Sequence, residues 1–228
     1  DHPLSRDELA QYVAEQIPDG SYVNLGIGYP TKVAQYAGSK QGITFHTENG
    51  LLGVGALAEG DEINPNLINA GKIPVTVIPG ASYFDHAQSF AMIRGGHLDF
   101  CILGAYQVSA GGDIANWKIP GSDAAPAVGG AMDLVVGAKN IYVMMDLLDR
   151  DGKSKVVPAC TYPVTGVDCV NRIYTDRAVF EVRPGGLVVL DTFGTTLREL
   201  RELTGIDLKL DETTVNGQNT KELEHAGR

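Results

Sequence analysis

Apolar residues near the start of the chain recur at the spacing of an amphipathic helix. We predict that this helix begins after Ser5, because Ser5 and Glu8 have the spacing of a capping box. It is expected to end near the Pro-Asp-Gly run at residues 18–20. Its buried face consists of three residues at helical spacing, Leu9, Val13 and Ile17.

Three further stretches have helical character. Thr196 and Glu199 form a second capping box, and Gly205 marks the end of the helix that it starts. The apolar face of this helix comprises Leu197, Leu200 and Leu203. Residues 89–94 and 131–137 are also compatible with helices.

Elsewhere the apolar positions form short runs of strand length. Residues 22–27 lead through Gly28 to Pro30, which suits the first turn of a helix. Such alternation of strands and helices predicts an α/β fold, a largely parallel sheet flanked by helices in a single domain over residues 1–228. The other apolar runs are 75–78, 100–103, 141–145, 178–182 and 187–190.

Composition narrows the class of protein. The 228 residues are 43% hydrophobic, enough for a large core, and the net charge of -10 argues against nucleic-acid binding. The longest apolar runs are too short to span a membrane, and no signal-peptide pattern opens the chain. We therefore expect a cytoplasmic protein without membrane or nucleic-acid partners.

Cysteine and histidine spacing gives no sign of a metal or redox site. The three cysteines lack Cys-x-x-Cys spacing and the five histidines lack metal-ligand spacing, so we expect packed free thiols and no metal. The cysteines are Cys101, Cys160 and Cys169.

Glu48 stands between a strand-like run at residues 44–46 and the turn dipeptide Asn49-Gly50. A Glu beside Asn-Gly is typically a solvated turn residue, so this local pattern alone does not assign chemistry to it. A carboxylate here is expected to have an ordinary pKa near 4, and hence to be ionised. Space for a large ligand is predicted around it from the nearby glycines Gly50, Gly53 and Gly55.

Common nucleotide and hydrolase motifs are absent from the sequence. Gly26-Ile27-Gly28 starts like a dinucleotide-binding fingerprint, but Thr31 occupies the place of its third glycine. No Walker A loop and no Gly-x-Ser-x-Gly elbow occurs either. Nicotinamide, nucleoside-triphosphate and serine-hydrolase chemistry therefore lack support.

The run Thr47-Glu48-Asn49-Gly50 resembles the Ser-Glu-Asn-Gly signature of class I coenzyme A transferases, found in their β subunits or C-terminal halves. Thr47 replaces the usual Ser and keeps a hydroxyl. The resemblance implies the open α/β sandwich of a CoA-transferase β subunit. It extends through residues 24–28, 79–84, 95–99, 103–109, 112–117 and 129–134.

By this resemblance Glu48 is the nucleophile, which forms an acyl anhydride and then a glutamyl-CoA thioester. Oxyanion support is expected from the backbone of Gly104 and Ala105 and from the side chain of Asn49. Two further polar residues, Gln107 and Asn116, are expected to orient substrate or Glu48. No tightly bound cofactor is implied; the coenzyme A thioester is a substrate.

The resemblance also implies substrates. Residues 89–94, 126–129, 152–155 and 172–176 are most similar to family members that transfer CoA from succinyl-CoA to 3-oxoadipate in the β-ketoadipate pathway of aromatic degradation. Acetoacetate is the alternative acceptor. An acyl-CoA hydrolase and a non-catalytic ligand-binding subunit are alternatives of other classes.

A separate α subunit is the expected partner, in an α2β2 or similar assembly. The chain contains no Gly-Gly-Phe-Gly loop of the kind that the resemblance associates with the α half. Because CoA and the acids are anions and this chain is acidic, the site needs local cations. Three are possible sources: Arg94, Lys118 and Arg172.

Overall fold

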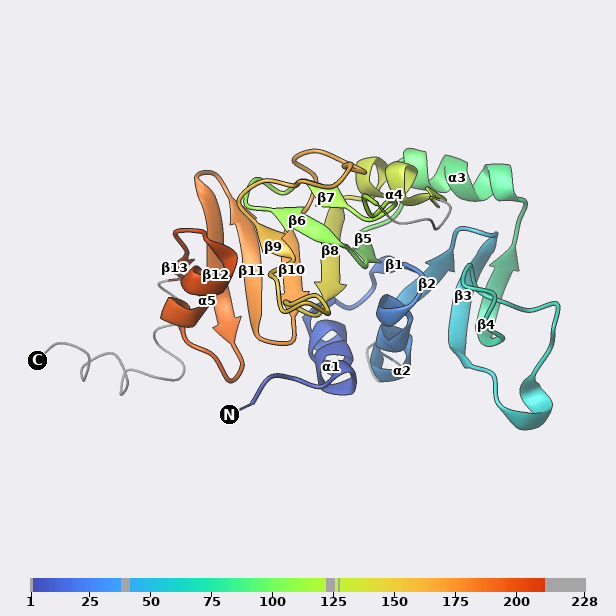
Figure 1. The fold of residues 1–228 in the computed structure, drawn as a ribbon. Coiled ribbons are helices and arrows are strands. Elements are labelled where there is room, and N and C mark those ends of the chain that lie inside the picture. The colour runs from blue at the N-terminus through green and yellow to red at the C-terminus, as the bar shows by residue number, and fades with distance from the viewer. Residues whose placement is uncertain (1, 38–41, 122–125, 127, 212–228) are drawn as a thin grey trace, which may run out of the picture.

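A ten-stranded sheet forms the centre of the molecule (Figure 1). The computed structural model describes residues 2–37, 42–121, 126 and 128–211. The rest of the predicted domain over 1–228 lies outside the described residues. In spatial order the strands are β13 (Lys209–Leu210), β12 (Gly186–Thr192), β11 (Ala178–Arg183), β10 (Arg172–Thr175), β8 (Asn140–Met145), β5 (Phe100–Leu103), β1 (Tyr22–Leu25), β2 (Thr44–Thr47), β3 (Leu51–Leu57) and β4 (Val75–Tyr83).

The central strands β10, β8, β5, β1 and β2 run parallel to one another. Antiparallel pairs, β10 with β11, β11 with β12, β2 with β3 and β3 with β4, extend the sheet on both sides. The prediction of a largely parallel sheet flanked by helices is therefore confirmed. Because strands β1, β2 and β5 are parallel, their carboxyl ends lie at the same edge of the sheet, where α/β proteins place ligands.

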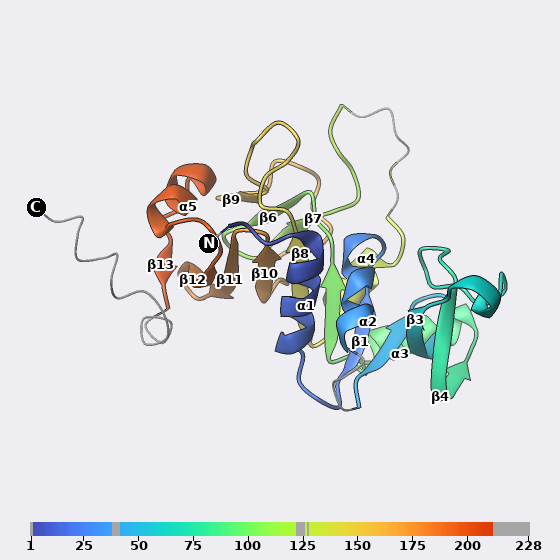
Figure 2. The same cartoon turned by 90° about the horizontal axis from the view of Figure 1, so that it is seen from below.

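Helices cover both faces of the sheet (Figures 1 and 2). One face carries α1 (Arg6–Gln16) and α2 (Val33–Tyr36), the latter preceded by the 3₁₀ turn η1 (Tyr29–Lys32). A second 3₁₀ turn, η3 (Gly60–Glu62), lies in the segment between β3 and β4. The other face carries α3 (His86–Arg94), α4 (Ala131–Gly137), α5 (Leu197–Thr204) and a small sheet of β7 (Ile114–Ala115), β6 (Gln107–Ser109) and β9 (Val156–Val157).

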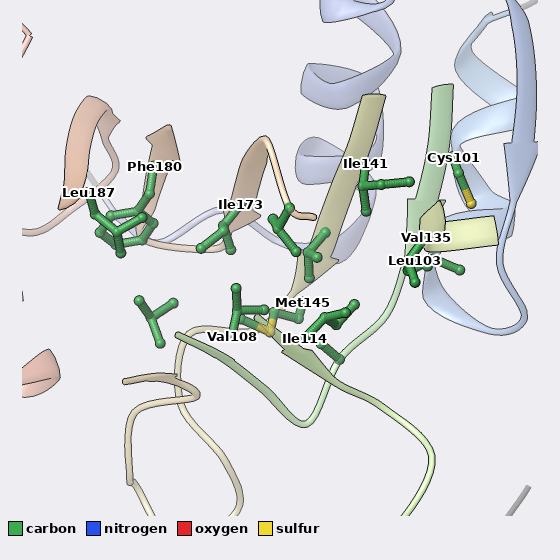
Figure 3. Close-up of a cluster of buried hydrophobic side chains, with 14 of the residues drawn as sticks. Cys101, Leu103, Val108, Ile114, Val135, Ile141, Met145, Ile173, Phe180 and Leu187 are labelled. Atoms are coloured by element: carbon green, nitrogen blue, oxygen red, sulfur yellow. The ribbon is translucent and has the colours of Figure 1, made fainter. Parts of the chain in front are cut away.

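Buried strands contribute alternate residues to two separate cores. Phe100 and Ile102 of β5 pack in the core under α1, whereas Cys101 and Leu103 pack in the opposite core with α3, α4 and α5. This alternation follows from the two-residue period of a strand. Figure 3 shows the second core, where residues of β5, β8, β10, β11 and β12 meet Val108 and Ile114 of the small sheet.

The predicted helix signals are confirmed. Ser5 and Glu8 cap each other's backbone N–H groups at α1, and Thr196 and Glu199 do the same at α5. Gly205 ends α5 in the left-handed conformation, with φ 68°. Helix α3 begins earlier than residue 89, because the Asp85 side chain accepts a hydrogen bond from Gln88 N and caps it.

Strand β4 is longer than the predicted run at residues 75–78 and continues through Pro79 to Tyr83. Proline cannot donate to a sheet ladder, which favours edge positions. Strand β4 lies at the edge of the sheet, so only one side of it must pair.

Candidate active site

Glu48 begins the turn that joins β2 to β3 at the carboxyl edge of the parallel strands. Gly50 N donates to Thr47 O at 3.1 Å, and Phe84 N donates to Gly50 O at 3.0 Å. A Cβ at Gly50 would lie 2.1 Å from Phe84 O, and its φ is 114°. Only glycine fits this position, so the turn that carries Glu48 is clamped against the chain after β4.

The carboxylate of Glu48 packs against the start of α4. A Cβ added to Gly130 would lie 2.2 Å from Glu48 Oε2 and 2.8 Å from Phe90 Cζ. The missing side chain at Gly130 therefore gives the carboxylate its place, beside the ring of Phe90. Within the described part of the chain, no group donates a hydrogen bond to this half-buried carboxylate.

Burial raises the pKa of Glu48 above its ordinary value. His86 opposes this shift and Asp133 adds to it. The expectation of an ordinary pKa is thus wrong, because the folded chain removes part of the water around the carboxylate. A carboxylate with a higher pKa and less solvation is the better nucleophile for an acyl group.

A buried polar ladder lies beneath Glu48. Register places Asn24 of β1 beside both His46 of β2 and Cys101 of β5. Asn24 Nδ2 lies 3.0 Å from His46 Nδ1, and Ser89 Oγ of α3 lies 3.0 Å from His46 Nε2. His46 contacts Ser89 of α3 and Glu48 packs beside Phe90 of the same helix, so both side chains lie on the same face of the sheet.

The ladder fixes the tautomer of His46. Asn24 Nδ2 also donates to the backbone carbonyl of His46 at 3.2 Å, so the amide nitrogen must face the histidine. His46 Nδ1 is then the acceptor, and Nε2–H donates to Ser89. Burial lowers the pKa of His46 to about 4, in agreement with a neutral ring. Sequence reasoning assigns no role to Asn24 or Ser89; a polar residue within an apolar strand is the signal that points to Asn24.

Space around the strand glycines differs from the prediction. A Cβ at Gly53 would lie 3.0 Å from Ala81 Cα, and one at Gly55 would lie 2.4 Å from Thr76 Oγ1. These glycines let β4 approach β3 and leave no room for a ligand, so that expectation is wrong. Gly104 does face open space, with no atom within 4 Å of an added Cβ.

Asn49 is exposed and its side chain is held within the turn. Thr47 Oγ1 donates to Asn49 Oδ1, and Asn49 Nδ2 donates to Ile68 O at 2.9 Å. This ties the turn to the segment before β4. One amide hydrogen remains for a ligand, so the predicted oxyanion role stays a prediction.

Gly104 and Ala105 follow β5, two strands away from β2 at the same edge of the sheet. Asn116 Nδ2 donates to Gly104 O at 3.3 Å, while Thr165 Oγ1 donates to Asn116 Oδ1 at 2.5 Å. The planar trans peptide then fixes the direction of the Ala105 N–H, opposite to the Gly104 carbonyl. Asn116 therefore positions the Gly104–Ala105 peptide; its contact with substrate stays a prediction.

Gln107 organises a neighbouring loop. Its Oε1 accepts from the backbone N–H groups of Thr161 and Tyr162 at 2.8 and 3.1 Å, and its Nε2 donates to Thr161 Oγ1 at 3.0 Å. The structure brings Gln107 together with this loop. Its role toward substrate or Glu48 is untested.

Of the three candidate cations, Arg94 belongs to the surroundings of Glu48. Its Nε donates to Asp133 Oδ1 at 2.6 Å, and Asp133 acts on the pKa of Glu48. Arg172 is instead paired with Glu181 at 2.8 Å within the sheet. Lys118 is exposed in the chain after Asn116.

Neither a metal cluster nor a membrane span is found in the described residues. No group of three or more His, Cys, Asp or Glu side chains there could hold a metal ion. No helix among them is long and apolar enough to cross a membrane.

Residues 6–192 match the sequence profile of coenzyme A transferase. The chain belongs to the coenzyme A transferase family. The resemblance of the chain to this family is thereby confirmed.

Relatives in this family differ in length. The chain is 54% identical to the B subunit of 3-oxoadipate CoA-transferase from Pseudomonas putida, over 90% of this chain and 96% of that one. It is 45% identical to the B subunit of succinyl-CoA:3-ketoacid coenzyme A transferase from Helicobacter pylori, over 90% and 99%. It is 43% identical to the mitochondrial succinyl-CoA:3-ketoacid coenzyme A transferase 2A of Rattus norvegicus, over 92% of this chain but 41% of the rat enzyme.

Solved structures share the fold of the family. The acyl-CoA transferase YdiF of Escherichia coli O157:H7, in a thioester complex with CoA, superposes with a TM-score of 0.71 at 20% identity; the match spans 92% of this chain and 42% of that chain. The decarboxylase AibA/AibB superposes with a TM-score of 0.63 at 20% identity, over 92% and 87%. Since a decarboxylase shares this fold, the site residues and not the fold must identify the reaction.

Proposed function

We propose that this chain is the glutamate-bearing subunit of a transferase that moves CoA from succinyl-CoA to 3-oxoadipate. The observation that carries the proposal is the placement of Glu48: half-buried, without a hydrogen-bond donor among the described residues, and held against Gly130 in a Thr-Glu-Asn-Gly turn. Similarity to the Pseudomonas putida protein supports the choice of substrates.

In the first half of the proposed reaction, a carboxylate oxygen of Glu48 attacks the thioester carbonyl of succinyl-CoA and expels CoA thiolate. The product is a mixed anhydride between Glu48 and succinate. The thiolate then attacks the Glu48 carbonyl carbon, succinate leaves, and a glutamyl-CoA thioester remains. Both additions place negative charge on a carbonyl oxygen, so backbone N–H groups near Gly104 and Ala105 and the amide of Asn49 are the proposed donors.

In the second half, a carboxylate of 3-oxoadipate attacks the glutamyl thioester and expels the thiolate. The thiolate attacks the acyl carbon of the new anhydride, giving 3-oxoadipyl-CoA and the free Glu48 carboxylate. Acyl activation is preserved throughout, provided that water is excluded. Partial burial of Glu48 supports this requirement.

A separate α-type subunit is the proposed partner. Relatives of similar length are named as B subunits, and the matching part of the rat enzyme is less than half of its chain. An exposed edge of the sheet supports a partner next to Glu48: β4 has apolar side chains in solvent, among them Ile78 at 40% and Tyr83 at 65% exposure. Tyr83 pairs with Leu51, which follows the Glu48 turn. An α2β2 assembly is our proposal for the complex.

Acetoacetate is the second candidate acceptor, favoured by the similarity to the Helicobacter pylori protein. Acetoacetate ranks second because this chain has the larger sequence identity to the 3-oxoadipate transferase. For the setting of the reaction we propose aromatic degradation by the β-ketoadipate pathway, in the cytoplasm. Free thiols at all three cysteines support a reducing compartment.

The test is transfer by the purified complex of both subunits, followed as 3-oxoadipyl-CoA formed from succinyl-CoA. Glu48→Gln is expected to remove transfer while the melting temperature stays near that of the wild type, because only the reacting oxygen is lost. Incubation with succinyl-CoA alone, followed by peptide mass spectrometry, is expected to place the adduct on Glu48. An adduct elsewhere, or hydrolysis without any acceptor, contradicts the proposal.

A further inference from the structure

One face of α3 presents a cation and an aromatic ring to solvent beside Glu48. His86, Phe90 and Arg94 are spaced by four residues, so they lie in a row along the helix. Together with Ala87 they line an open hollow of about 300 Å³. The ring of Phe90 lies 4.7 Å from that of His86, and the guanidinium carbon of Arg94 lies 5.7 Å from its centroid.

The carboxylate of Glu48 lies beside Phe90, one of the residues that line this hollow. Phe90 Cζ and Glu48 Oε2 both border the small space above Gly130. Asp133, which follows Gly130 in α4, acts on the pKa of Glu48 and pairs with Arg94. An acyl group attached to Glu48 therefore starts beside the Phe90 ring, which in turn lies next to Arg94.

The guanidinium of Arg94 is held in place yet open to a ligand. Its Nε donates to Asp133 at 2.6 Å, and its Cζ lies over the Phe90 ring, 5.7 Å from the centroid. No described residue bonds to its terminal nitrogens, and 66% of the side chain is exposed. These two nitrogens present the forked donor geometry that suits a carboxylate.

The substrates of the proposed reaction supply such a carboxylate. In 3-oxoadipate one methylene separates the reacting carboxyl carbon from the 3-oxo carbon, and a second carboxyl carbon ends the chain five bonds from the first. Acetoacetate has a methyl group instead. We propose that Arg94 binds the distal carboxylate of the acceptor and thereby selects dicarboxylic 3-oxo acids, an inference that rests on the function proposed above.

Asp133 makes the effect of losing Arg94 larger. In the wild type its charge is compensated by the guanidinium, with Nε and Oδ1 2.6 Å apart. Without the guanidinium, Asp133 remains next to the position of residue 94 as an uncompensated anion and repels a second carboxylate. The double variant Arg94→Gln with Asp133→Asn is therefore expected to regain part of the selectivity that Arg94→Gln loses.

The experiment compares two acceptors of equal chain length, 3-oxoadipate and 3-oxohexanoate, which differ by a distal carboxylate against a methyl group. In a ping-pong reaction the kcat/KM for the acceptor depends only on the second half-reaction, so effects on succinyl-CoA cancel. Wild-type complex is expected to prefer 3-oxoadipate, and Arg94→Gln to lower the ratio of the two kcat/KM values about tenfold. Arg94→Lys keeps the charge and is expected to retain part of the preference.

Arg198→Gln is the matched control, since Arg198 is also an exposed helical arginine whose Nε pairs with a carboxylate, Glu202, at 3.0 Å. It is expected to leave the ratio unchanged. Melting curves check that each variant is folded. Raising the salt concentration should lower the preference of the wild type for 3-oxoadipate, because the contact between Arg94 and the distal carboxylate is exposed to solvent. It should not lower the preference of Arg94→Gln, which lacks that contact.

Each outcome has one meaning. An unchanged ratio in folded Arg94→Gln overturns the inference and leaves the proposed function standing. A wild-type complex that transfers CoA without preferring 3-oxoadipate over 3-oxohexanoate also overturns it. A folded complex that transfers CoA to neither acid, nor to acetoacetate, instead overturns the proposed function.

Discussion

Replacing Gly130 with Ala tests whether the position of the Glu48 carboxylate governs the chemistry. Gly130 has φ -88° and ψ 5°, a conformation with negative φ that residues other than glycine also adopt. The new Cβ would lie 2.2 Å from Glu48 Oε2, whereas ordinary contact begins at 3.4 Å. Since Oε2 ends a flexible side chain, the carboxylate will move by about 1 Å while the fold stays intact. The ring of Phe90 will also shift slightly, because its Cζ would lie 2.8 Å from the new Cβ.

A displacement of about 1 Å at a reacting group costs about 100-fold in rate, or about 2.7 kcal/mol in the barrier. We therefore expect Gly130→Ala to lower kcat by about 100-fold with little change in melting temperature. The assay is CoA transfer by the complex, together with mass spectrometry of the Glu48 adduct, whose formation should slow in parallel.

Gly111→Ala is the matched control. Gly111 does not have a positive φ, and the nearest atom to an added Cβ, Ser109 Oγ, is 3.8 Å away. This variant should keep full activity. If Gly130→Ala transfers CoA within about threefold of the wild type, the position of the carboxylate against α4 does not control the reaction and the reasoning is refuted.

Two further predictions concern the ladder beneath the site and the sheet edge. The pKa of His46 in the folded chain, about 4, lies below its unfolded value of 6.5, so the unfolded state binds the proton first and stability falls as the pH drops from 6.5 through 4. The free energy of unfolding should fall by about 3 kcal/mol. Urea unfolding of the wild type and of His46→Gln at pH 7 and pH 4 should show this loss in the wild type alone. Equal losses in both proteins would remove His46 as the cause. Tyr83→Asp changes a side chain of β4 that is 65% exposed, and it should weaken association with the α-type subunit about tenfold, measured by sedimentation. Val167→Asp, at a side chain that is 69% exposed away from that edge, should not weaken it. Unchanged association of Tyr83→Asp would exclude this edge as the interface.

Local signals in the sequence predicted the elements that close within a few residues. The capping boxes at Ser5 and Thr196 and the terminating Gly205 are satisfied inside their own helices, so neighbouring residues suffice to predict them. Apolar runs likewise predicted the buried strands. The Thr-Glu-Asn-Gly turn identified Glu48, through a resemblance and not through local physics.

Predictions failed where distant segments meet. Gly53 and Gly55 were expected to face a ligand, but they accommodate β4, which pairs with β3 across a long connection. Sequence spacing does not reveal which backbone approaches a glycine. The extension of β4 past Pro79 was missed for a related reason, since only its place at the sheet edge makes proline acceptable there.

By itself the sequence determined the capped starts of α1 and α5, the end of α5 at Gly205, the buried strands and the residue that the family motif marks as reactive. Only the tertiary structure decided what surrounds that residue: Gly130 and Phe90 against its carboxylate, Asn24 and His46 below it, and Arg94 beside it. The physical reason is that these groups come from separate helices and strands. Their contacts depend on the order of the strands and on which face each helix covers, which many weak contacts along the whole chain determine together.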